Sequence, residues 1–494
     1  MGIIAKQTLR GSVFIYMGIA LGFLTTGLLF PRFLSVGEIG AINLILKYAA
    51  LLSIIANLGF TSVGAKLFPF FRDKNNGNNG YLKLNLLVSL FGFLMCCLIF
   101  VFFQDFLIEQ NQKKSPIFSQ YLYYILPFTL SVTLFNILNT YNRGLYNAVA
   151  GTFLKELVQR IFILIGILLI IFNLISFQFF IPIYYLATLV PIIGLLWILN
   201  QNKELQLTPY KHKLKSQFKK ELITVSLFGI LNNAGATIVT AIDTIMVNEN
   251  LGESQAGVYA TVALFSTVII APSRPLISIA TTFLADAWKA NDMNKIRELY
   301  AKSSINQLLF GSLIFIGIWA NIDNIFNLIP KNFSIGKDVV FFLGLGALIN
   351  MIMGLNSSII AVSKLFKWQA YFIVAFTILI IFTNYLLIPQ YGIIGAGIAS
   401  LISITIHNSL KLIFVLVKFK MQPFTRKTIL MIVIGIVVFF IQKLIPSLIW
   451  TIDLPVRSVL ITLVFTFVVY LFKISEDFNR QVDKLLNLFL KNNI

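Results

Sequence analysis

Charged side chains inside long apolar stretches are the residues of this sequence whose types and positions could do chemistry. Arg274 is the clearest, because it stands between two prolines in the sequence APSRP at 271–275, within the apolar stretch 256–282. A charge inside a membrane span is costly and commonly functional, and prolines release backbone carbonyls that protein or water must satisfy. A cation beside such a break suits an anionic ligand such as a phosphate. The alternative is an arginine that braces the bend by bonding the freed carbonyls.

Three further charged residues lie within apolar stretches, each near the end of its stretch that is predicted to face the outside of the cell. Lys47 lies about two helical turns inside the stretch 41–64, and Arg32 lies near the end of the stretch 11–34. Both are candidates to line a substrate cavity, and the alternative is that they reach the outer headgroups. Asp243 is a candidate for an outer gate with Lys47 or Arg32, or for a coupling-cation site; the alternative is a cap on the adjacent turn.

A second basic group is predicted near the inner side. Arg143 ends one apolar stretch, and Lys155 and Arg160 open the next. This inner rim could attract a lipid pyrophosphate, although lysine and arginine are common on the inner side of membrane proteins in general. His407, in a later stretch, is expected to be a packed, hydrogen-bonded histidine, with a proton relay as the alternative.

The composition places these charges in lipid. Of the 494 residues, 58% are hydrophobic and 12% are charged, and the mean hydropathy is +0.86. Soluble chains carry about 25% charged residues, so no soluble core could hide this much apolar surface. A soluble enzyme, a secreted disulfide scaffold and a nucleic-acid-binding domain are excluded. Cys96 and Cys97 are adjacent in an apolar run and are expected to be packed, unpaired residues.

The apolar runs predict an all-α polytopic membrane protein of about fourteen spans. Each run is near the roughly 20 residues that a spanning helix needs, and the first continues too far for a cleavable signal peptide. Most of the 39 lysines and arginines fall in segments on one side, which places both termini in the cytoplasm. The predicted spans are 11–34, 41–64, 82–103, 117–142, 157–175, 177–199, 222–246, 256–282, 305–330, 337–362, 368–388, 393–417, 428–446 and 456–473.

Two short turns indicate an internal repeat. The sequence LSVGEIG ends at Gly40 and LGESQAG ends at Gly257, an offset of 217 residues. Six spans with the same starting side in each half imply two lobes in parallel topology with a site between them. The predicted segments are a first lobe at 1–200, a basic linker at 201–221, a second lobe at 222–420, two further spans at 421–475 and an interfacial tail at 476–494.

Polar amides accompany the charges. At the repeat offset the counterpart of Arg274 is Asn57, so the two lobes would present different polarity at this position. Asn232 and Asn233 lie in the seventh predicted span, where they could line the cavity or hydrogen-bond between helices.

Motifs for catalysis do not occur in the sequence. It contains no phosphate-binding loop, no zinc-ligand spacing and no Gly-x-Ser-x-Gly elbow. No large outer loop holds a pair of acids. Transport without a cofactor or bound metal is therefore expected, rather than an enzyme.

The chain resembles the polysaccharide flippases of the MOP exporter superfamily. The resemblance rests on the span pattern, the basic linker and the Arg-Pro break. It also rests on the stretches FPRFL at 30–34, KLFPFFR at 66–72 and YGIIGAGIA at 391–399. These stretches look like those of bacterial O-antigen or capsule repeat-unit flippases.

This resemblance implies a V-shaped transporter of the bacterial inner membrane with two lobes. It would move an undecaprenyl-pyrophosphate-linked oligosaccharide to the outer leaflet by alternating access, for lipopolysaccharide or other polysaccharide biosynthesis. Arg274 corresponds best to the cationic cavity residues of such flippases, and Lys47 and Arg32 correspond more loosely. Spans thirteen and fourteen resemble those that form a lipid groove in the peptidoglycan-precursor flippase. A polysaccharide polymerase is an expected partner, and nucleic acid is not.

Two other functions remain open. A drug/cation antiporter of the same superfamily would usually carry membrane carboxylates in a lobe and have twelve spans. A membrane polymerase or ligase would need a large outer loop with arginine or histidine. The sequence leaves the sugar, the coupling ion and the oligomeric state open.

Overall fold

The computed structural model describes residues 3–207, 216–446 and 448–491, and these contain helices and no strand. Contacts divide them into two compact units. Unit 1 comprises the described residues of Met1–Thr261 and Ile373–Ala396, and unit 2 comprises those of Val262–Phe372 and Gly397–Ile494. The predicted division at the linker 201–221 into lobes of six spans stays a prediction, and the basic segment 211–215 lies outside the described residues.

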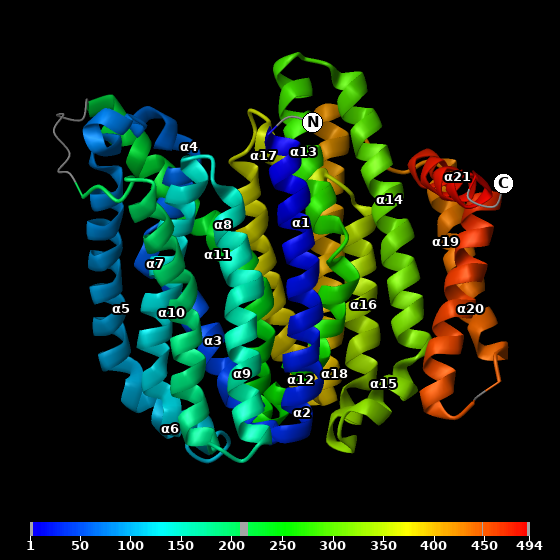
Figure 1. Cartoon of the computed structure of the whole chain (residues 1–494), viewed down its shortest axis with the longest axis horizontal. Helices are drawn as coiled ribbons and strands as arrows, with labels where there is room; N and C mark the ends of the chain where they lie inside the picture. Colours follow the sequence, from blue (N-terminus) through cyan, green and yellow to red (C-terminus); the bar gives the residue numbers. More distant parts are fainter. Residues whose placement is uncertain (1–2, 208–215, 447, 492–494) are drawn as a thin grey trace. The chain divides into compact units, whose positions relative to one another are not determined.

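Unit 1 is built on α3, which packs against α5, α7 and α11, while α7 also packs against α10. These helices run beside one another in Figure 1. A capping box starts α3: Ser35 Oγ accepts from the Glu38 backbone N–H, and the Glu38 carboxylate accepts from the Ser35 N–H. The elements of unit 1 are α1 (Ile3–Gly22), η1 (Phe23–Leu29), α2 (Phe30–Phe33), α3 (Val36–Asn57), α4 (Phe60–Phe71), η2 (Lys74–Gly80), α5 (Tyr81–Asn111), α6 (Pro116–Tyr121), η3 (Leu122–Tyr124), α7 (Ile125–Gly144), α8 (Ala148–Phe153), η4 (Leu154–Val158), α9 (Gln159–Ile171), α10 (Phe177–Gln201) and α11 (Ser216–Leu251), with the first part of α12 (Glu253–Ile270) and the middle of α18 (Trp368–Phe419).

Unit 2 is built on α14, which packs against α13, α16, α19 and α20. Its elements are the remainder of α12 and α18 with α13 (Ser273–Lys289), α14 (Met293–Ala320), α15 (Ile322–Leu328), η5 (Lys331–Gly336), α16 (Lys337–Ile352), α17 (Asn356–Val362), α19 (Arg426–Ile441), η6 (Gln442–Leu444), α20 (Trp450–Leu471) and α21 (Glu476–Lys491).

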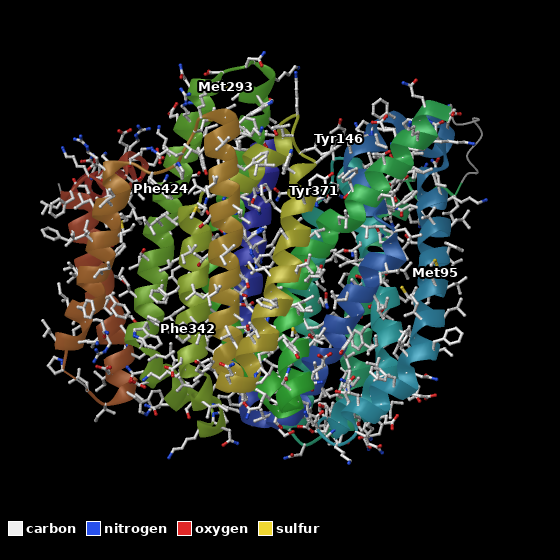
Figure 2. All side chains as sticks on the ribbon, turned by 180° about the vertical axis from the view of Figure 1, so that it is seen from behind. Met95, Tyr146, Met293, Phe342, Tyr371 and Phe424 are labelled. Carbon is white, nitrogen blue, oxygen red and sulfur yellow. The ribbon has the colours of Figure 1, made fainter. Side chains whose placement is uncertain are left out.

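The outer surface of α5 fits lipid rather than water. Phe91 and Phe102 are 61% and 80% exposed, and Met95 lies on the outside of unit 1 in Figure 2. A soluble protein rarely exposes so continuous an apolar face. The chain is therefore a multi-pass membrane protein.

Eleven of the described helices are long and apolar enough to cross a membrane. The predicted spans without a counterpart of their own among the eleven are 157–175, 222–246 and one of the pair 368–388 and 393–417. The predicted span 157–175 falls on η4 and the 13-residue α9, and α11, which covers the predicted span 222–246, is not among the eleven. The predicted spans 368–388 and 393–417 are one helical element, α18, in which Gly392 has φ 60 and ψ −142. The count of fourteen stays a prediction.

The second span of each predicted repeat is interrupted. Between α12 and α13 the break falls at Ala271 and Pro272, as the prolines predict. Between α3 and α4 it falls at Leu58 and Gly59, which have φ 45 and 74. The sequence interpretation missed this second break, since no proline marks it, and treated 41–64 as one span.

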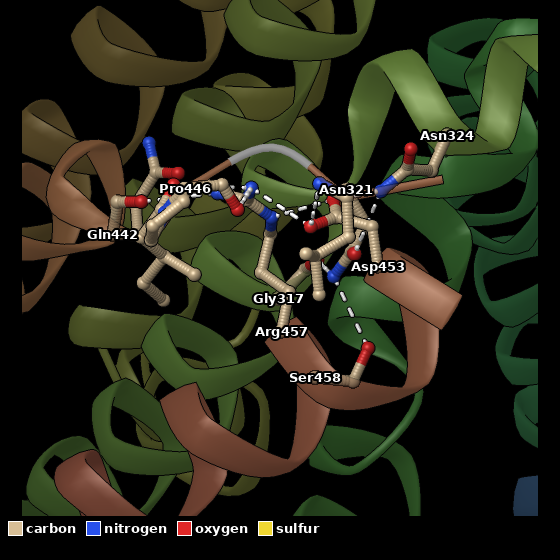
Figure 3. A network of polar contacts seen from close by, with 10 residues as sticks. Gly317, Asn321, Asn324, Gln442, Pro446, Asp453, Arg457 and Ser458 are labelled. Carbon is tan, nitrogen blue, oxygen red and sulfur yellow. Dashed lines mark hydrogen bonds and ion pairs between the residues drawn. The ribbon is translucent and has the colours of Figure 1, made fainter. Parts of the chain in front are cut away.

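The end of unit 2 is fixed by two polar groups. Around α21, Asn306 donates to the Asp477 carboxylate at 3.2 Å and Tyr470 donates to Asp483 at 2.6 Å. At the other end of α20, the buried Arg457 pairs with Asp453 at 2.9 Å (Figure 3). The Arg457 guanidinium also donates to carbonyls of the α19–α20 connection, and Asn324 donates to Asp453 at 2.6 Å. The ions are therefore neutralised where they are removed from water.

Candidate functional site

Arg274 lies in unit 2, in the first turn of α13, and its side chain is exposed. The guanidinium has no hydrogen bond or ion pair with any residue that the structure describes. The carbonyl of Ile270, at the end of α12, instead accepts from Ser273 Oγ at 2.7 Å. Ser273, rather than Arg274, therefore bonds this carbonyl at the break, and a ligand-binding role of Arg274 stays a prediction.

Asp243 is the centre of a polar cluster in unit 1. Its carboxylate is 5% exposed and accepts from Tyr259 OH at 2.8 Å and from Asn384 Nδ2 at 2.7 Å. The carboxylate also interacts electrostatically with Lys47 on α3. The predicted gate or coupling role of Asp243 with Lys47 stays a prediction, and Asn384 was not among the predicted residues. An amide donor next to a buried acid gives no periodic signal in a sequence.

Lys155, Glu156 and Arg160 lie together along η4 and α9. Arg160 pairs with Glu156 at 2.9 Å, and Lys155 Nζ lies 4.9 Å from the centre of the Phe135 ring. The pair packs on α1, where a Cβ added at Gly22 would meet the Arg160 guanidinium. Gly22 is near the middle of the first predicted span. A role for Lys155 and Arg160 in binding a headgroup stays a prediction.

The remaining predicted residues of unit 1 are dispersed. Asn57 is buried beside the α3–α4 break; its Oδ1 accepts from the Thr61 backbone N–H at 2.8 Å, and its Nδ2 has no partner among the described residues. Arg32 and Arg143 are exposed, at the ends of α2 and α7. Asn233 lies half-buried on α11, and the side chain of Asn232 lies outside the described residues.

The two glycine-ended turns pack on one another within unit 1. A Cβ at Gly40 would lie 1.9 Å from the Glu253 carbonyl oxygen, and one at Gly257 would lie 2.2 Å from the Val36 carbonyl oxygen. Only glycine allows two helices to approach so closely. The Glu253 carboxylate accepts from the backbone N–H groups of Ile117 and Phe118 at 3.2 and 2.7 Å, which joins α12 to α6.

Lys411 is a buried cation that sequence reasoning missed. It lies on α18 in unit 2, is 5% exposed, and donates to Ser357 Oγ at 3.0 Å. No carboxylate of the described chain forms an ion pair with it. The signal was present, since Lys411 falls inside the predicted span 393–417, but it was counted with the inner loop.

Unit 2 also contains an apolar groove of about 520 Å³ between α14, α16 and α19. Gly435 of α19 lines this groove, and a Cβ there would make only ordinary contact, with Ser312. Among its other lining residues are Leu308, Phe315, Phe341, Leu348, Ile432, Ile436 and Phe439. Its lining suits a hydrocarbon chain.

The chain is similar to known proteins in sequence and in fold. The sequence model of the family described as "Polysaccharide biosynthesis protein" matches residues 8–283. Among solved structures, the chain is similar to the lipid II flippase MurJ in an inward closed conformation, with a TM-score of 0.73 and 14% identity over 94% of this chain and 100% of that one. It is also similar to an inward-facing MATE family multidrug resistance transporter of the MOP superfamily, with a TM-score of 0.64 and 14% identity over 83% and 94%. No curated protein matches the chain. The structural likenesses confirm the predicted all-α fold.

Proposed function

This chain belongs to the polysaccharide biosynthesis protein family, a flippase family of the MOP superfamily, and we propose that it is a flippase for a polyprenyl-pyrophosphate-linked oligosaccharide. The cargo moves from the cytoplasmic to the outer leaflet of the bacterial inner membrane, for polysaccharides such as the O-antigen of lipopolysaccharide. Undecaprenyl is the proposed carrier, and both termini are proposed to be cytoplasmic.

The observation that carries the proposal is the position of Arg274 beside the helix break. Its guanidinium forms no ion pair with a described residue. An isolated cation within a span is costly unless an anion or water meets it. A pyrophosphate offers several oxygens to the planar guanidinium, which binds such groups through paired hydrogen bonds. Lys47 and Arg32 are proposed as further cavity cations, with Asn57, Asn232 and Asn233 as polar lining.

The apolar groove in unit 2 supports a lipid cargo. Its lining from α14, α16 and α19 suits a polyprenyl tail while the charged headgroup occupies a polar site. The resemblance also implied that the thirteenth predicted span, 428–446, helps to form a lipid groove, and α19, which overlaps this span, lines the groove described here. The name of the similar MurJ structure, a lipid II flippase, also supports a lipid-linked cargo.

Alternating access is proposed to use the two packed turns as an outer gate. When Gly40 and Gly257 are in contact, the outer side is closed. Asp243 with Lys47 is proposed as the coupling-ion or gate group next to these turns.

The test is transport in liposomes of a fluorescent polyprenyl-pyrophosphate oligosaccharide, with label reaching the opposite leaflet as readout. Arg274→Ala is expected to abolish transport and Arg274→Lys to restore part of it, because lysine keeps the charge without the paired hydrogen bonds. Arg297→Ala, which removes an exposed cation on α14, is the matched control and should retain transport. Full transport by Arg274→Ala would contradict the proposal.

A cation-coupled antiporter is the second candidate, favoured by the buried Asp243 and by the similarity to MATE transporters. The same liposomes distinguish the two. Efflux of a cationic dye driven by a sodium or proton gradient, with no movement of any lipid-linked saccharide, would support the antiporter.

A further inference from the structure

A polar pocket of about 350 Å³ at one end of unit 1 has no part in the function described so far. Figure 2 shows Tyr146, one of its residues, at this end of the helices. The α4–α5 connection that borders it contains the lysines and arginines that the charge distribution places in the cytoplasm. The lining residues are Arg72, Lys74, Asn78, Asn142, Leu145, Tyr146, Asn147, Leu199, Asn202 and Glu204.

The floor of the pocket is held by the segment η2, whose sequence is KNNGNNG. Gly77, Asn78 and Asn79 all have positive φ, near 50–60°, which glycine and asparagine tolerate. This turn buries Asn78, whose Nδ2 donates to Tyr141 OH at 2.8 Å and to the Glu204 carboxylate at 3.3 Å. Tyr141 of α7 and Glu204, in the segment after α10, thereby fix the turn from parts of the chain distant in sequence, so the pocket is preformed.

Arg72 brings a positive charge that the described chain does not neutralise. Its guanidinium donates to Tyr146 OH and to the Gly144 carbonyl, both at 2.5 Å, and it stacks 4.2 Å from the centre of the Tyr146 ring. These partners are neutral, and the buried Nε has no partner among the described residues. Lys74 and Glu204 form an ion pair, with 3.3 Å between Lys74 Nζ and Glu204 Oε1, so their charges cancel. The pocket therefore keeps the charge of one guanidinium.

Two amides at the pocket wall are uncommitted. Asn147 stands at the N-cap of α8 but makes no capping hydrogen bond, and Asn202 ends α10. Neither side chain has a hydrogen bond with a residue that the structure describes. An amide offers a donor and an acceptor side by side, which matches neighbouring hydroxyls of a sugar, each of which also donates and accepts.

We propose that this pocket binds an acidic saccharide unit of the cargo before translocation. The inference rests on the proposed function and adds a saccharide subsite to it. Arg72 pairs with the carboxylate or phosphate of the sugar, and Asn147 and Asn202 bond its hydroxyls. The 69% exposed Tyr146 ring supplies an apolar edge. Amides outnumber unpaired cations here, which favours a sugar over a bare phosphate or a phospholipid headgroup. The volume lies in the range of small-ligand sites.

The test is direct binding to the purified full-length protein, which requires no transport. The probes are a uronic-acid-containing tetrasaccharide, a neutral tetrasaccharide of equal length, inorganic phosphate and phosphatidylglycerol vesicles. The acidic tetrasaccharide is expected to bind at least tenfold more tightly than the neutral one and than phosphate. Asn147→Ala and Asn202→Ala are each expected to weaken it about three- to tenfold, and Arg72→Lys at least tenfold. Asn200→Ala, an exposed neighbour on α10 outside the pocket, should bind as the wild type does.

Unchanged affinity in both asparagine variants would overturn the subsite, as would phosphate or phosphatidylglycerol binding as tightly as the acidic saccharide. The subsite and the proposed function can fail separately. Saccharide binding that depends on Asn147 and Asn202, in a protein that moves no lipid-linked saccharide, would support the pocket and remove the flippase proposal. Transport of a lipid-linked saccharide by a protein that binds no free saccharide would support the flippase proposal and remove the pocket.

Discussion

Gly40 and Gly257 lie backbone against backbone, so that a Cβ on either would fall about 2 Å from a carbonyl oxygen of the other turn. The helices that contain them, α3 and α12, begin at Val36 and Glu253, which keeps the 217-residue offset of the two glycines. The repeat seen in the sequence is therefore also a contact in the molecule. The close contact of these two turns is the proposed outer gate, which would open when they separate.

Gly40→Ala is expected to separate the two turns. Overpacking costs about 1–3 kcal/mol, which corresponds to a roughly 5- to 150-fold shift between two states. The measurement is labelling of Ala256→Cys by a membrane-impermeant maleimide, in a background with Cys96 and Cys97 replaced by alanine. Ala256 is fully buried next to the turn, so label should enter faster when the turns part. Gly317→Ala is the control, because a Cβ there meets nothing within 4 Å; equal labelling in both would refute the gate.

Asp453→Ala is expected to destabilise unit 2 strongly. It leaves Arg457 buried without its counter-charge, a loss of about 3–5 kcal/mol for a buried pair. Thermal unfolding of the purified protein measures the effect. Asp323→Ala breaks the pair with Lys337, in which Asp323 is 81% exposed, and should cost less than about 1 kcal/mol. A double variant, Asp453→Leu with Arg457→Leu, should be more stable than Asp453→Ala, and a less stable double variant would argue against charge burial as the cause.

Asp243→Asn tests whether this carboxylate couples transport to an ion gradient. Asparagine keeps the shape and the contact with Tyr259 but removes the charge. If Asp243 holds a coupling cation, acceleration of transport by a sodium or proton gradient should fall at least tenfold while the melting temperature changes little. Asp286→Asn, an exposed acid on α13, is the matched control. Retained gradient dependence in Asp243→Asn would leave the carboxylate with a structural role.

Gly435→Phe is expected to fill the apolar groove. Transport of a long polyprenyl carrier should fall about tenfold, because a tail of many isoprene units loses its apolar contacts. A carrier of two isoprene units should be moved at the wild-type rate. Ile429→Phe, which enlarges a 64% exposed side chain of α19 outside the groove, is the control. Equal loss for both carriers would show that the groove does not hold the tail.

Helices and their interruption at Pro272 could be predicted from sequence, because apolar runs and proline act locally. The break at Leu58 could not, since a left-handed leucine is stabilised by packing of Gly59 on α11 rather than by its own type. The packing of Arg160 on Gly22 of a distant helix could not be predicted either, because the two residues are far apart in the sequence. Lys411 could have been singled out, because it falls inside the predicted span 393–417, but its burial among the packed helices could not have been predicted. Charged residues in the sequence thus indicate candidate site residues, and the packing of the helices decides which of these residues contact one another.

The buried pair of Asp453 and Arg457 has a consequence for how the chain enters its membrane. The two residues are four apart on one helix and can meet as soon as α20 forms. An arginine delivered to the far side of a membrane normally resists translocation and helps to set orientation. Paired with its own aspartate, Arg457 would cross as a neutral group. In the predicted orientation, with both termini in the cytoplasm, the final hairpin would insert with this arginine at its outer end without opposing the bias that the lysines and arginines of the inner segments set.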